Sequence, residues 1–493
     1  MRPLELPPED FHRLAARVSE LATEYLKTMD KRPTFPRLDA TENDALFRTP
    51  APEIGLGEKA FDALEDVFRR SRIQNGRFFG YVLGSGEPVA ALGDLIASVV
   101  NQNITAWRSG PAAVTIEKTV VDWLAQALGC GGFRGSFTGG GSSANLMALA
   151  MARESIAPAN ESGLRTAPEL TLYASTEAHM SIGKAVALLG IGRENLRLIA
   201  ADKEFKLNPA RLEAAVVADQ KAGKRPFAVI ASAGTVNTGS IDPLPEIAAI
   251  ARRFGMWFHI DGAYGALAAM AVPDKFRGLA EANSISLDPH KWLYQPLDCS
   301  CILYRDFRAG ESPAEKAFSH TGDYARSLSQ DPIESFAFFE ETVELSRRFR
   351  ALKLWLSLRY HGFNAFRAAI GKDLELAQLL ARKIEAVPSL ELMSPVELSA
   401  VCFRHRRLPG KGLVESELSE QKQRTSGAQA SEPLNEFNSR ILKRVIERGR
   451  VYLSNATLQG DFCLRACLVN HRTTKADIEE VISEVLAAAG EVV

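Results

Sequence analysis

Two short motifs carry the residues with the most specific chemistry. Lys291 lies in the segment Ser286–Trp292, directly after a short apolar run, and Asp261 lies in His259–Gly265, at the end of an earlier one. A lysine can form a Schiff base with pyridoxal 5'-phosphate (PLP), and an aspartate can hold the proton on the pyridine nitrogen of PLP. Each residue alone is more often a solvated lysine or a turn aspartate. Together, each beyond a predicted strand, they indicate a PLP site.

A glycine-rich segment, Thr138–Asn145, comes before a helical run at Leu146–Arg153. Its glycines would let backbone N–H groups approach an anion closely, and the start of the helix adds partial positive charge. The sequence lacks the Gly-Lys-Ser/Thr of a Walker loop and the GxGxxG of a dinucleotide fingerprint. Alone, the segment is equally well explained as a flexible loop. Beside the lysine and the aspartate, it predicts a phosphate cradle.

Two further polar residues come after predicted strands. His179 comes after the strand expected at Leu170–Tyr173, where an imidazole could stack on a cofactor ring. Thr235 comes after the strand expected at Phe227–Ala231 and could hydrogen-bond near the cofactor. Taken singly, they would be a satisfied structural histidine and an ordinary turn threonine.

The scaffold is predicted from alternating apolar strands and helices. Phe227–Ala231 is expected to be a buried strand, and Met256–Ile260 the next one. Between them, Asp242 is expected to cap a helix with Pro243 at its first position and Gly255 just past its end. Such units build a mostly parallel sheet covered by helices, so the predicted class is α/β, with ligands at the carboxyl ends of strands. Other strands are expected at 170–173, 196–200, 284–287 and 299–304.

The pattern divides the chain into three parts. Residues 1–85 are expected to form an N-terminal helical arm that includes a helix at Glu58–Arg70. Residues 86–365 are expected to form the large PLP-binding domain. Residues 366–493 are expected to form a smaller α+β domain with a polar insertion at 410–432. In that domain, strands are expected at 400–404 and 462–469, and a final helix at 475–489.

Composition argues against several classes of protein. The 59 Lys and Arg balance 60 Asp and Glu, so no net field attracts nucleic acid or an anionic membrane. No basic-then-apolar leader occurs, and no apolar run approaches the roughly 18 residues of a membrane span. The six cysteines lack a CxxC pair and are expected to be buried thiols, without disulfides or a zinc site. We therefore expect a cytoplasmic protein with a small-molecule ligand.

The motifs resemble those of the group II PLP-dependent amino-acid decarboxylases, in particular the aromatic-L-amino-acid decarboxylase type. The resemblance extends from about Phe78 to the end of the chain. It is carried most specifically by Asp288–Trp292 and His259–Tyr264, and also by Trp107–Pro111 and Arg347–Phe349. It implies the PLP-dependent transferase fold (aspartate aminotransferase-like, fold type I) and conversion of an L-amino acid to its primary amine and CO2. It also implies a homodimer with the active site at the interface.

The resemblance assigns roles to individual residues of the cofactor site. It makes Lys291 the Schiff-base lysine, Asp261 the partner of the pyridine nitrogen, Ala263 the small residue under the ring and His179 the stacking histidine. The positions that hold the phosphate or shape its pocket are Gly141, Ser142, Asp288 and His290. Asp288 is asparagine in some relatives, and a carboxylate beside a phosphate is electrostatically unfavourable.

The resemblance also implies which residues meet the substrate. Tyr81 and Trp107 match residues of the substrate pocket, and Phe79 is a third aromatic candidate nearby. Ser346 matches a position that is serine in phenol-preferring plant relatives and glycine in indole-preferring ones. These residues favour an aromatic substrate such as Tyr, DOPA, Phe or Trp. Tyr324, in a polar segment expected to form a lid, matches the tyrosine that protonates the substrate α-carbon.

Other functions remain open at this point. An aldehyde synthase of the same fold, which lets O2 react after CO2 is lost, would carry Phe in place of Tyr324 or a changed His179. A non-catalytic binding protein on this fold would have lost Lys291 or Asp261. All four residues are present, which favours the decarboxylase. Glutamate and sulfinate decarboxylases share the core motifs, and Arg465 could either pair with a carboxylate or be structural.

Overall fold

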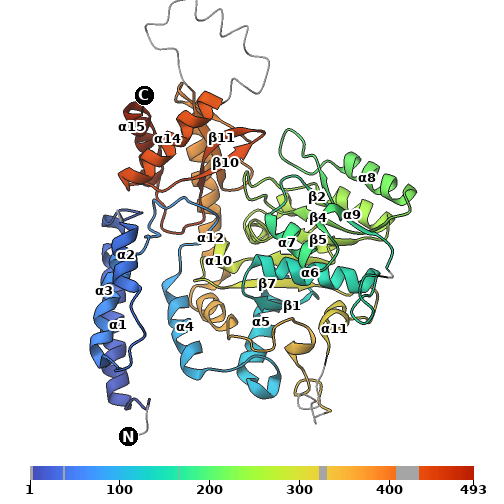
Figure 1. Cartoon of the computed structure of the whole chain (residues 1–493), viewed down its shortest axis with the longest axis horizontal. Helices are drawn as coiled ribbons and strands as arrows, with labels where there is room; N and C mark the ends of the chain where they lie inside the picture. The colour runs from blue at the N-terminus through green and yellow to red at the C-terminus, as the bar shows by residue number, and fades with distance from the viewer. Residues whose placement is uncertain (1–3, 37–38, 166, 321–329, 407–431, 493) are drawn as a thin grey trace, which may run out of the picture.

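The structure is a computed structural model that describes residues 4–36, 39–165, 167–320, 330–406 and 432–492. Figure 1 shows the N-terminal helices along one side, a large α/β unit on the other, and a second, smaller sheet near the C-terminus. Tyr324 and nearly all of the polar insertion expected at 410–432 lie outside the described residues.

A seven-stranded sheet in the order β1-β7-β6-β5-β4-β2-β3 forms the large unit. Strands β2 to β6 run parallel to one another, whereas β7 is antiparallel to both β6 and β1. The mostly parallel sheet predicted from the sequence is confirmed, and each expected strand lies within two residues of an observed one. The strands are β1 (Arg134–Thr138), β2 (Leu170–Ser175), β3 (Leu196–Ile199), β4 (Arg225–Ser232), β5 (Trp257–Asp261), β6 (Ser284–Leu287) and β7 (Ser300–Tyr304).

Both faces of this sheet are covered, so its inner strands β2, β5, β6 and β7 are buried along their whole length. Successive side chains of a strand point to opposite faces. In β4, Val229 and Ala231 therefore belong to the core cluster that includes residues of α5 and α9, whereas Ala228 and Ile230 belong to the cluster that includes residues of α6 and α7. The helices of this unit are α4 (Pro88–Val100), α5 (Pro111–Ala127), α6 (Gly141–Ile156), α7 (Met180–Leu188), α8 (Pro209–Lys221), α9 (Leu244–Arg253), α10 (Pro289–Trp292) and α11 (Pro313–Phe318).

The start of α9 differs from the sequence prediction. Pro243 is the N-cap residue and Asp242 makes no cap hydrogen bond. The Asp242 carboxylate instead accepts hydrogen bonds from the backbone N–H groups of Leu207 and Ser232, both at 2.7 Å. Burial raises its pKa to about 7. The predicted cap was wrong because its two donors come from distant segments, while Gly255 does lie just past the helix, with φ 63°.

The smaller unit is a four-stranded antiparallel sheet in the order β10-β11-β9-β8, covered by helices α14 and α15. The strands expected at 400–404 and 462–469 are confirmed as β9 and β11, and the final helix is confirmed as α15. The elements are β8 (Leu390–Leu392), β9 (Ala400–His405), α14 (Glu432–Arg448), β10 (Ser454–Leu458), β11 (Asp461–Cys467) and α15 (Lys475–Glu491). A capping box between Thr474 and Asp477 begins α15.

The long helix α12 (Ala351–Glu385) connects the two units. It packs against α4 and α5 at one end and against α15 and β8 at the other (Figure 1). Gly362 interrupts its helical dihedral angles with φ 75°, a value that glycine adopts without strain. The helix therefore fixes how the small sheet sits beside the large one.

The N-terminal helices α1 (Pro8–Thr28), α2 (Ala40–Phe47) and α3 (Ala63–Arg70) contain no buried residue. The helix expected at Glu58–Arg70 is divided into a 3-10 helix, Gly57–Asp62, and α3. Rings of Tyr25 and Phe68 lie 5.2 Å apart and join α1 to α3. The boundaries expected between arm, large domain and small domain stay a prediction.

The cysteines are buried and free, as the sequence predicted. Burial raises the pKa of the Cys130 and Cys463 thiols to about 11 each, so both are protonated near neutral pH. Within the described residues, no helix combines the length and apolar character that crossing a membrane requires.

Asp373 of α12 is a buried carboxylate at the junction of the two units. Its Oδ2 accepts hydrogen bonds from the Tyr294 hydroxyl and from the backbone N–H of Asn470, both at 2.9 Å. Among the described residues, its Oδ1 has no hydrogen-bond partner. Burial raises the pKa of Asp373 to about 7, so the folded chain holds this proton more tightly than the unfolded chain does.

We expect Asp373 to make stability fall as pH rises. Its contribution is complete below the unfolded pKa of roughly 4 and is lost as pH rises towards 7, because over this range the unfolded chain releases the proton while the folded chain still holds it. Asp373→Asn stays neutral, so its unfolding free energy relative to wild type should rise by on the order of 2 kcal/mol between pH 5 and pH 8. Chemical denaturation at both pH values measures this. An exposed control, Asp274→Asn, should show no such change, and an equal difference at both pH values would contradict the assignment.

Candidate active site

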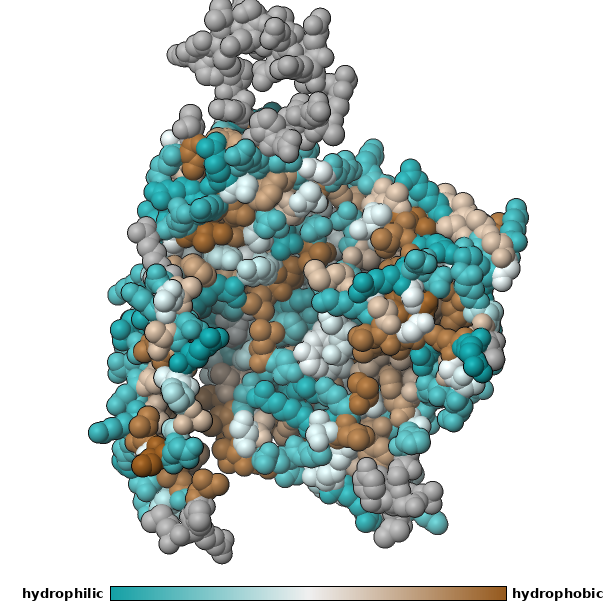
Figure 2. Space-filling view, in the orientation of Figure 1, coloured by the Kyte–Doolittle hydropathy of each residue, from teal (hydrophilic) through white to brown (hydrophobic). Residues whose placement is uncertain are grey.

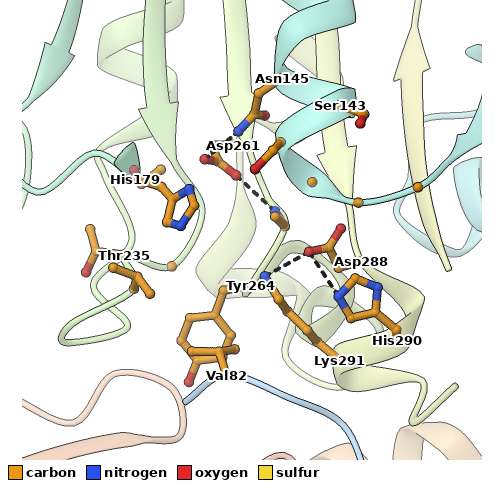
Figure 3. A pocket seen from close by; sticks show the side chains of 18 of the residues that line it. Val82, Ser143, Asn145, His179, Thr235, Asp261, Tyr264, Asp288, His290 and Lys291 are labelled. Atoms are coloured by element: carbon orange, nitrogen blue, oxygen red, sulfur yellow. Dashed lines mark hydrogen bonds and ion pairs between the residues drawn. The ribbon is translucent and has the colours of Figure 1, made fainter. Parts of the chain in front are cut away.

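A cavity of about 460 Å³ lies at the carboxyl ends of β5 and β6. Figure 3 shows side chains from several elements pointing into it. The residues predicted from the sequence that line it are Gly141, Ser142, His179, Thr235, Asp261, Ala263, Asp288, His290 and Lys291. The chain thus brings its glycine-rich segment, its aspartate motif and its lysine motif to one place.

Asp261 is the last residue of β5, and its carboxylate is surrounded by donors. Its Oδ1 accepts from the Ser286 hydroxyl at 3.1 Å and from the backbone N–H of Ala263 at 3.2 Å. Its Oδ2 accepts from Asn145 Nδ2 at 3.0 Å (Figure 3). Hydrogen bonds to a carboxylate compensate for the hydration that burial removes. A fixed negative charge therefore faces the cavity.

Lys291 belongs to the short helix α10, directly after β6. Its Nζ lies 2.8 Å from Asp288 Oδ2 (Figure 3). Asp288 is fully buried and also accepts from the Ser300 hydroxyl at 2.6 Å. Burial alone would raise the pKa of Asp288, but the charges of Lys291 and His290 outweigh it and hold the pKa below its ordinary value. Asp288 is thus an ionised partner for the lysine.

The N-terminus of α6 provides the cradle expected for a phosphate. A Cβ atom at Gly141 would stand 3.0 Å from both the Ala263 methyl group and the Asp288 carboxylate. Only glycine leaves this space open. Gly141, Ser142 and Ser143 line the cavity at the first turn of α6, and the partial positive charge at the start of a helix favours an anion. The residues present therefore fit PLP: an anion cradle, an acid and a lysine amine open onto one space.

His179 is the N-cap residue of α7 and lines the wall that faces Asp261 (Figure 3). Its Nδ1 lies 2.8 Å from Ser181 Oγ and accepts from the Ser181 backbone N–H at 3.2 Å. Burial lowers the pKa of His179 even though the negative charge of Asp261 acts in the opposite direction. The imidazole is thus neutral at pH 7. Thr235 lies nearby, with its hydroxyl 2.8 Å from that of Thr238.

Three residues predicted to meet the substrate do not line this cavity in the single chain. Tyr81 is exposed, has φ 61°, and places its hydroxyl 3.1 Å from that of Tyr452. Trp107 is half-buried in the 3-10 helix Trp107–Ser109, and Ser346 is exposed. The nearby candidate Phe79 was wrong: it is completely buried in the core beneath the small sheet.

The cavity also contains residues that the sequence reasoning missed. Val82, Val236, Tyr264 and Leu297 supply apolar surface, and Asn145 supplies an amide. The sequence could have predicted Asn145 as a cavity residue. It lies four residues after Gly141, and residues four apart share one face of a helix.

Arg465 does not line the cavity but supports its wall. Its Nη1 donates to the carbonyl oxygen of Val236 at 2.5 Å and its Nε donates to the Ser454 hydroxyl at 3.2 Å. The guanidinium is buried and holds the Val236 loop against β10. The sequence left two roles open for Arg465, pairing with a carboxylate or a structural one. Within the single chain, its role is structural.

Comparison with known proteins finds that this chain is similar to pyridoxal-dependent decarboxylases in both sequence and fold. The conserved domain of pyridoxal-dependent decarboxylases matches residues 69–406. The aromatic-L-amino-acid decarboxylase of Bacillus atrophaeus is 31% identical, over 99% of this chain and 97% of its own length. The phenylacetaldehyde synthase of Petunia hybrida is 30% identical, over 93% of this chain and 90% of its own length. The solved structure of Oryza sativa TDC with PLP and tryptamine is 26% identical, with TM-score 0.88, and covers 100% of this chain and 99% of its own. These similarities confirm the expected PLP-dependent transferase fold of type I.

We expect Asp288→Asn to bind PLP more tightly than wild type. The substitution removes a negative charge next to the phosphate cradle. This change favours binding of the anionic cofactor, by roughly threefold to tenfold at pH 7 given the screened interactions of a partly open site. Fluorescence titration of the cofactor-free protein with PLP measures the change.

Asp298→Asn is the matched control for this charge change. Asp298 comes directly after the cavity residue Leu297, but its carboxylate accepts from Arg350 Nε at 2.8 Å and is more exposed. PLP affinity should change less in this variant. Weaker PLP binding by Asp288→Asn would show that the carboxylate helps to hold the cofactor, and equal binding would show that its charge does not oppose the phosphate.

Proposed function

Because the chain belongs to the pyridoxal-dependent decarboxylase family, it is a PLP-dependent amino-acid decarboxylase, and we propose that its substrate is an L-amino acid with an aromatic side chain. The products would be the primary amine and CO2. The observation that supports the assignment of the site is the meeting of Lys291, Asp261 and His179 around one cavity beside the N-terminus of α6.

Each polar residue of the cavity has a proposed task. PLP, when bound, supplies an electron sink for the electron pair that remains when the carboxylate leaves. Lys291 is the proposed attachment point of the cofactor, and Asp261 holds the proton at the pyridine nitrogen. His179 and Ala263 form the walls that confine the ring. Thr235 lies beside His179 and is proposed to donate a hydrogen bond to the cofactor.

The phosphate would be held by the cradle at the start of α6. Gly141 and Ser142 are proposed to contribute the first-turn donors. Asp288 and His290 are proposed to shape the opposite side of the cradle, with Asp288 acting through its ion pair to Lys291.

The surface of the cavity supports an aromatic over an acidic substrate. Its apolar contributors are Val82, Val236, Tyr264 and Leu297. In the described part of the chain, the basic side chains that line it are those of His179, His290 and Lys291, all with proposed tasks at the cofactor. An acidic side chain would need a further cation there. Tyr81, Trp107 and Ser346 are the proposed substrate contacts outside this wall.

We further propose a cytoplasmic homodimer with the active site at its interface. Helix α4 buries Ala90, Gly93 and Ala97 against the protein, but its other face leaves Leu92, Leu95, Ile96, Val99 and Val100 between 44% and 61% exposed. Figure 2 shows hydrophobic patches over the region of α1 to α4. An apolar face of this kind is typical of a surface that another subunit covers.

The proposed cytoplasmic location rests on the cysteines. The free, buried thiols suit a reducing compartment.

The function is tested first at Lys291. Wild-type protein treated with borohydride in the presence of PLP should carry a stable pyridoxyl group on Lys291, found by peptide mass spectrometry. Lys291→Ala should lose that group and all decarboxylation, because none of the other described residues that line the cavity carries an amine side chain. Lys184→Ala is the control, since this exposed lysine is near enough to act on the charge of His179. A trapped adduct at full occupancy in Lys291→Ala would remove the lysine from the site.

Tyr324 is the proposed proton donor to the substrate α-carbon. In Tyr324→Phe, amine formation should fall by roughly 100-fold or more, in the range of a lost general acid. Aldehyde, ammonia and peroxide should rise in air and not under nitrogen, because O2 then reacts before the proton arrives. PLP binding should be unchanged. Product analysis with Tyr, DOPA, Phe, Trp and glutamate measures this, beside the exposed control Tyr360→Phe.

The product panel also decides between the alternatives. Unchanged amine output from Tyr324→Phe would exclude its role as the donor. Aldehyde as the main wild-type product would make the chain an aldehyde synthase. Glutamate as the preferred substrate would replace the aromatic assignment with the acidic one.

A further inference from the structure

Asn145 lies at the centre of a buried hydrogen-bond network behind the cavity. Its amide nitrogen is 3.0 Å from Asp261 Oδ2 and 2.9 Å from the Ser181 hydroxyl. Its amide oxygen is 2.9 Å from His259 Nε2. The Asn145 side chain is 1% exposed, so all of its hydrogen bonds are made within the protein. One side chain therefore touches the carboxylate of Asp261 and, through Ser181, the ring of His179.

The orientation of the Asn145 amide is fixed from two sides. Asp261 offers only acceptor oxygens, so the amide must present its NH2 group to that carboxylate. The amide oxygen is then left to accept from His259. Burial lowers the pKa of His259 to about 4, so its neutral ring has a single N–H, which must be on Nε2.

The hydroxyl group that contacts His259 Nδ1 is consistent with a proton on Nε2. Trp257 Nε1 can only donate, and it donates to the Ser284 hydroxyl at 2.9 Å. The Ser284 hydroxyl is then free to donate its own proton to His259 Nδ1, at 2.9 Å. Trp257 and Ser284 are fully buried. The Ser284 carbonyl oxygen, an acceptor, also lies 3.2 Å from Nδ1, so the direction is set on the other side of the ring, where the Asn145 amide oxygen accepts from Nε2.

The same direction continues to His179. The second N–H of the Asn145 amide donates to the Ser181 hydroxyl, which in turn donates to His179 Nδ1 at 2.8 Å. The Ser181 backbone N–H donates to the same ring nitrogen at 3.2 Å. Two donors on Nδ1 leave the proton of the neutral ring on Nε2. His179, which lines the cavity, then carries its hydrogen-bond donor on the ring nitrogen that Ser181 does not contact.

We propose that Asn145 and Ser181 are positioning residues that couple Asp261 to His179: Asn145 orients the carboxylate and, through Ser181, fixes the Nε2–H tautomer of His179. The two groups that meet the cofactor ring are thereby set by one amide. The inference rests on the proposed function only for what Asp261 and His179 do to PLP. The tautomer itself is a property of the cofactor-free chain.

Asn145→Asp tests the direction of the network. Whether it is ionised or shares a proton with Asp261, the new side chain presents an acceptor oxygen to Ser181. The Ser181 hydroxyl should turn towards that oxygen, and His179 should then carry its proton on Nδ1. Ser181→Ala should leave both tautomers populated, because one of the two donors to Nδ1 is gone. Ser181→Thr keeps the hydroxyl and should restore the wild-type state.

Ser155→Ala is the matched control. It removes another buried helical hydroxyl, which in the described structure has no hydrogen-bond partner, and it lies on α6 like Asn145. If Asn145 and Ser181 only help the chain to fold, all of these variants should affect thermal stability and leave the tautomer of His179 unchanged.

The first readout is ¹⁵N NMR of cofactor-free protein with labelled histidine rings, with the His179 signals identified by their absence in His179→Gln. Wild type, Ser155→Ala and Ser181→Thr should show an unprotonated Nδ1 and a protonated Nε2 at pH 7. Asn145→Asp should show the reverse, and Ser181→Ala a mixture. The wild-type tautomer in both Asn145→Asp and Ser181→Ala would overturn the proposal.

The second readout is PLP affinity by fluorescence titration. Asn145→Ala should weaken PLP binding by roughly tenfold, the effect of losing one hydrogen bond to a charged group, whereas Ser181→Ala should leave the Asp261 branch and the affinity nearly intact. Equal losses in both variants would overturn the division of roles. If wild type bound no PLP and released no amine, the proposed function would fail, while the NMR result would still decide the network.

Discussion

A carboxylate buried at the end of β5 is the constraint on which the rest of the site depends. Such a group is stable only if donors replace its lost hydration. Asp261 takes one donor from its own turn, one from Ser286 and one from Asn145. The parallel register of β5 and β6 places Asp261 directly opposite Ser286. The same sheet edge that provides these donors also places Lys291, only five residues beyond that serine, beside the cavity.

The sequence could predict those parts of the site whose signal is local. Apolar runs predicted the strands, and a position just beyond such a run singled out Asp261 and Lys291, because the carboxyl ends of parallel strands meet at one edge. It could not predict partners brought together by tertiary packing. Asp242 has the spacing of a helix cap, yet its two N–H donors come from other segments. His259 stood in the motif, but its role depends on Asn145, more than a hundred residues earlier.

The segment that contains Phe79 and Tyr81 shows a second feature that the sequence could not predict. Phe79 and Tyr81 are both aromatic and two residues apart, and both were expected near the substrate, Tyr81 from the family resemblance and Phe79 from its aromatic side chain. In the structure, Phe79 hydrogen-bonds through its backbone to Tyr452 and Cys467, which draws its ring into the core of the small sheet. Tyr81, with a left-handed backbone, turns out towards the surface. A pairing with a distant strand, which no local pattern encodes, decides between these positions.

The ion pair between Asp288 and Lys291 links the stability of the empty site to its affinity for the cofactor. A largely buried ammonium needs a counter-ion, and Asp288 supplies one that Ser300 holds in place. That carboxylate then stands next to the cradle at Gly141, where an anion is expected to bind. The Asp288 carboxylate therefore stabilises the Lys291 ammonium in the empty site, but it repels the phosphate group when PLP binds. The partial positive charge at the start of α6 acts against this repulsion, so the affinity for PLP reflects a balance between the two charges.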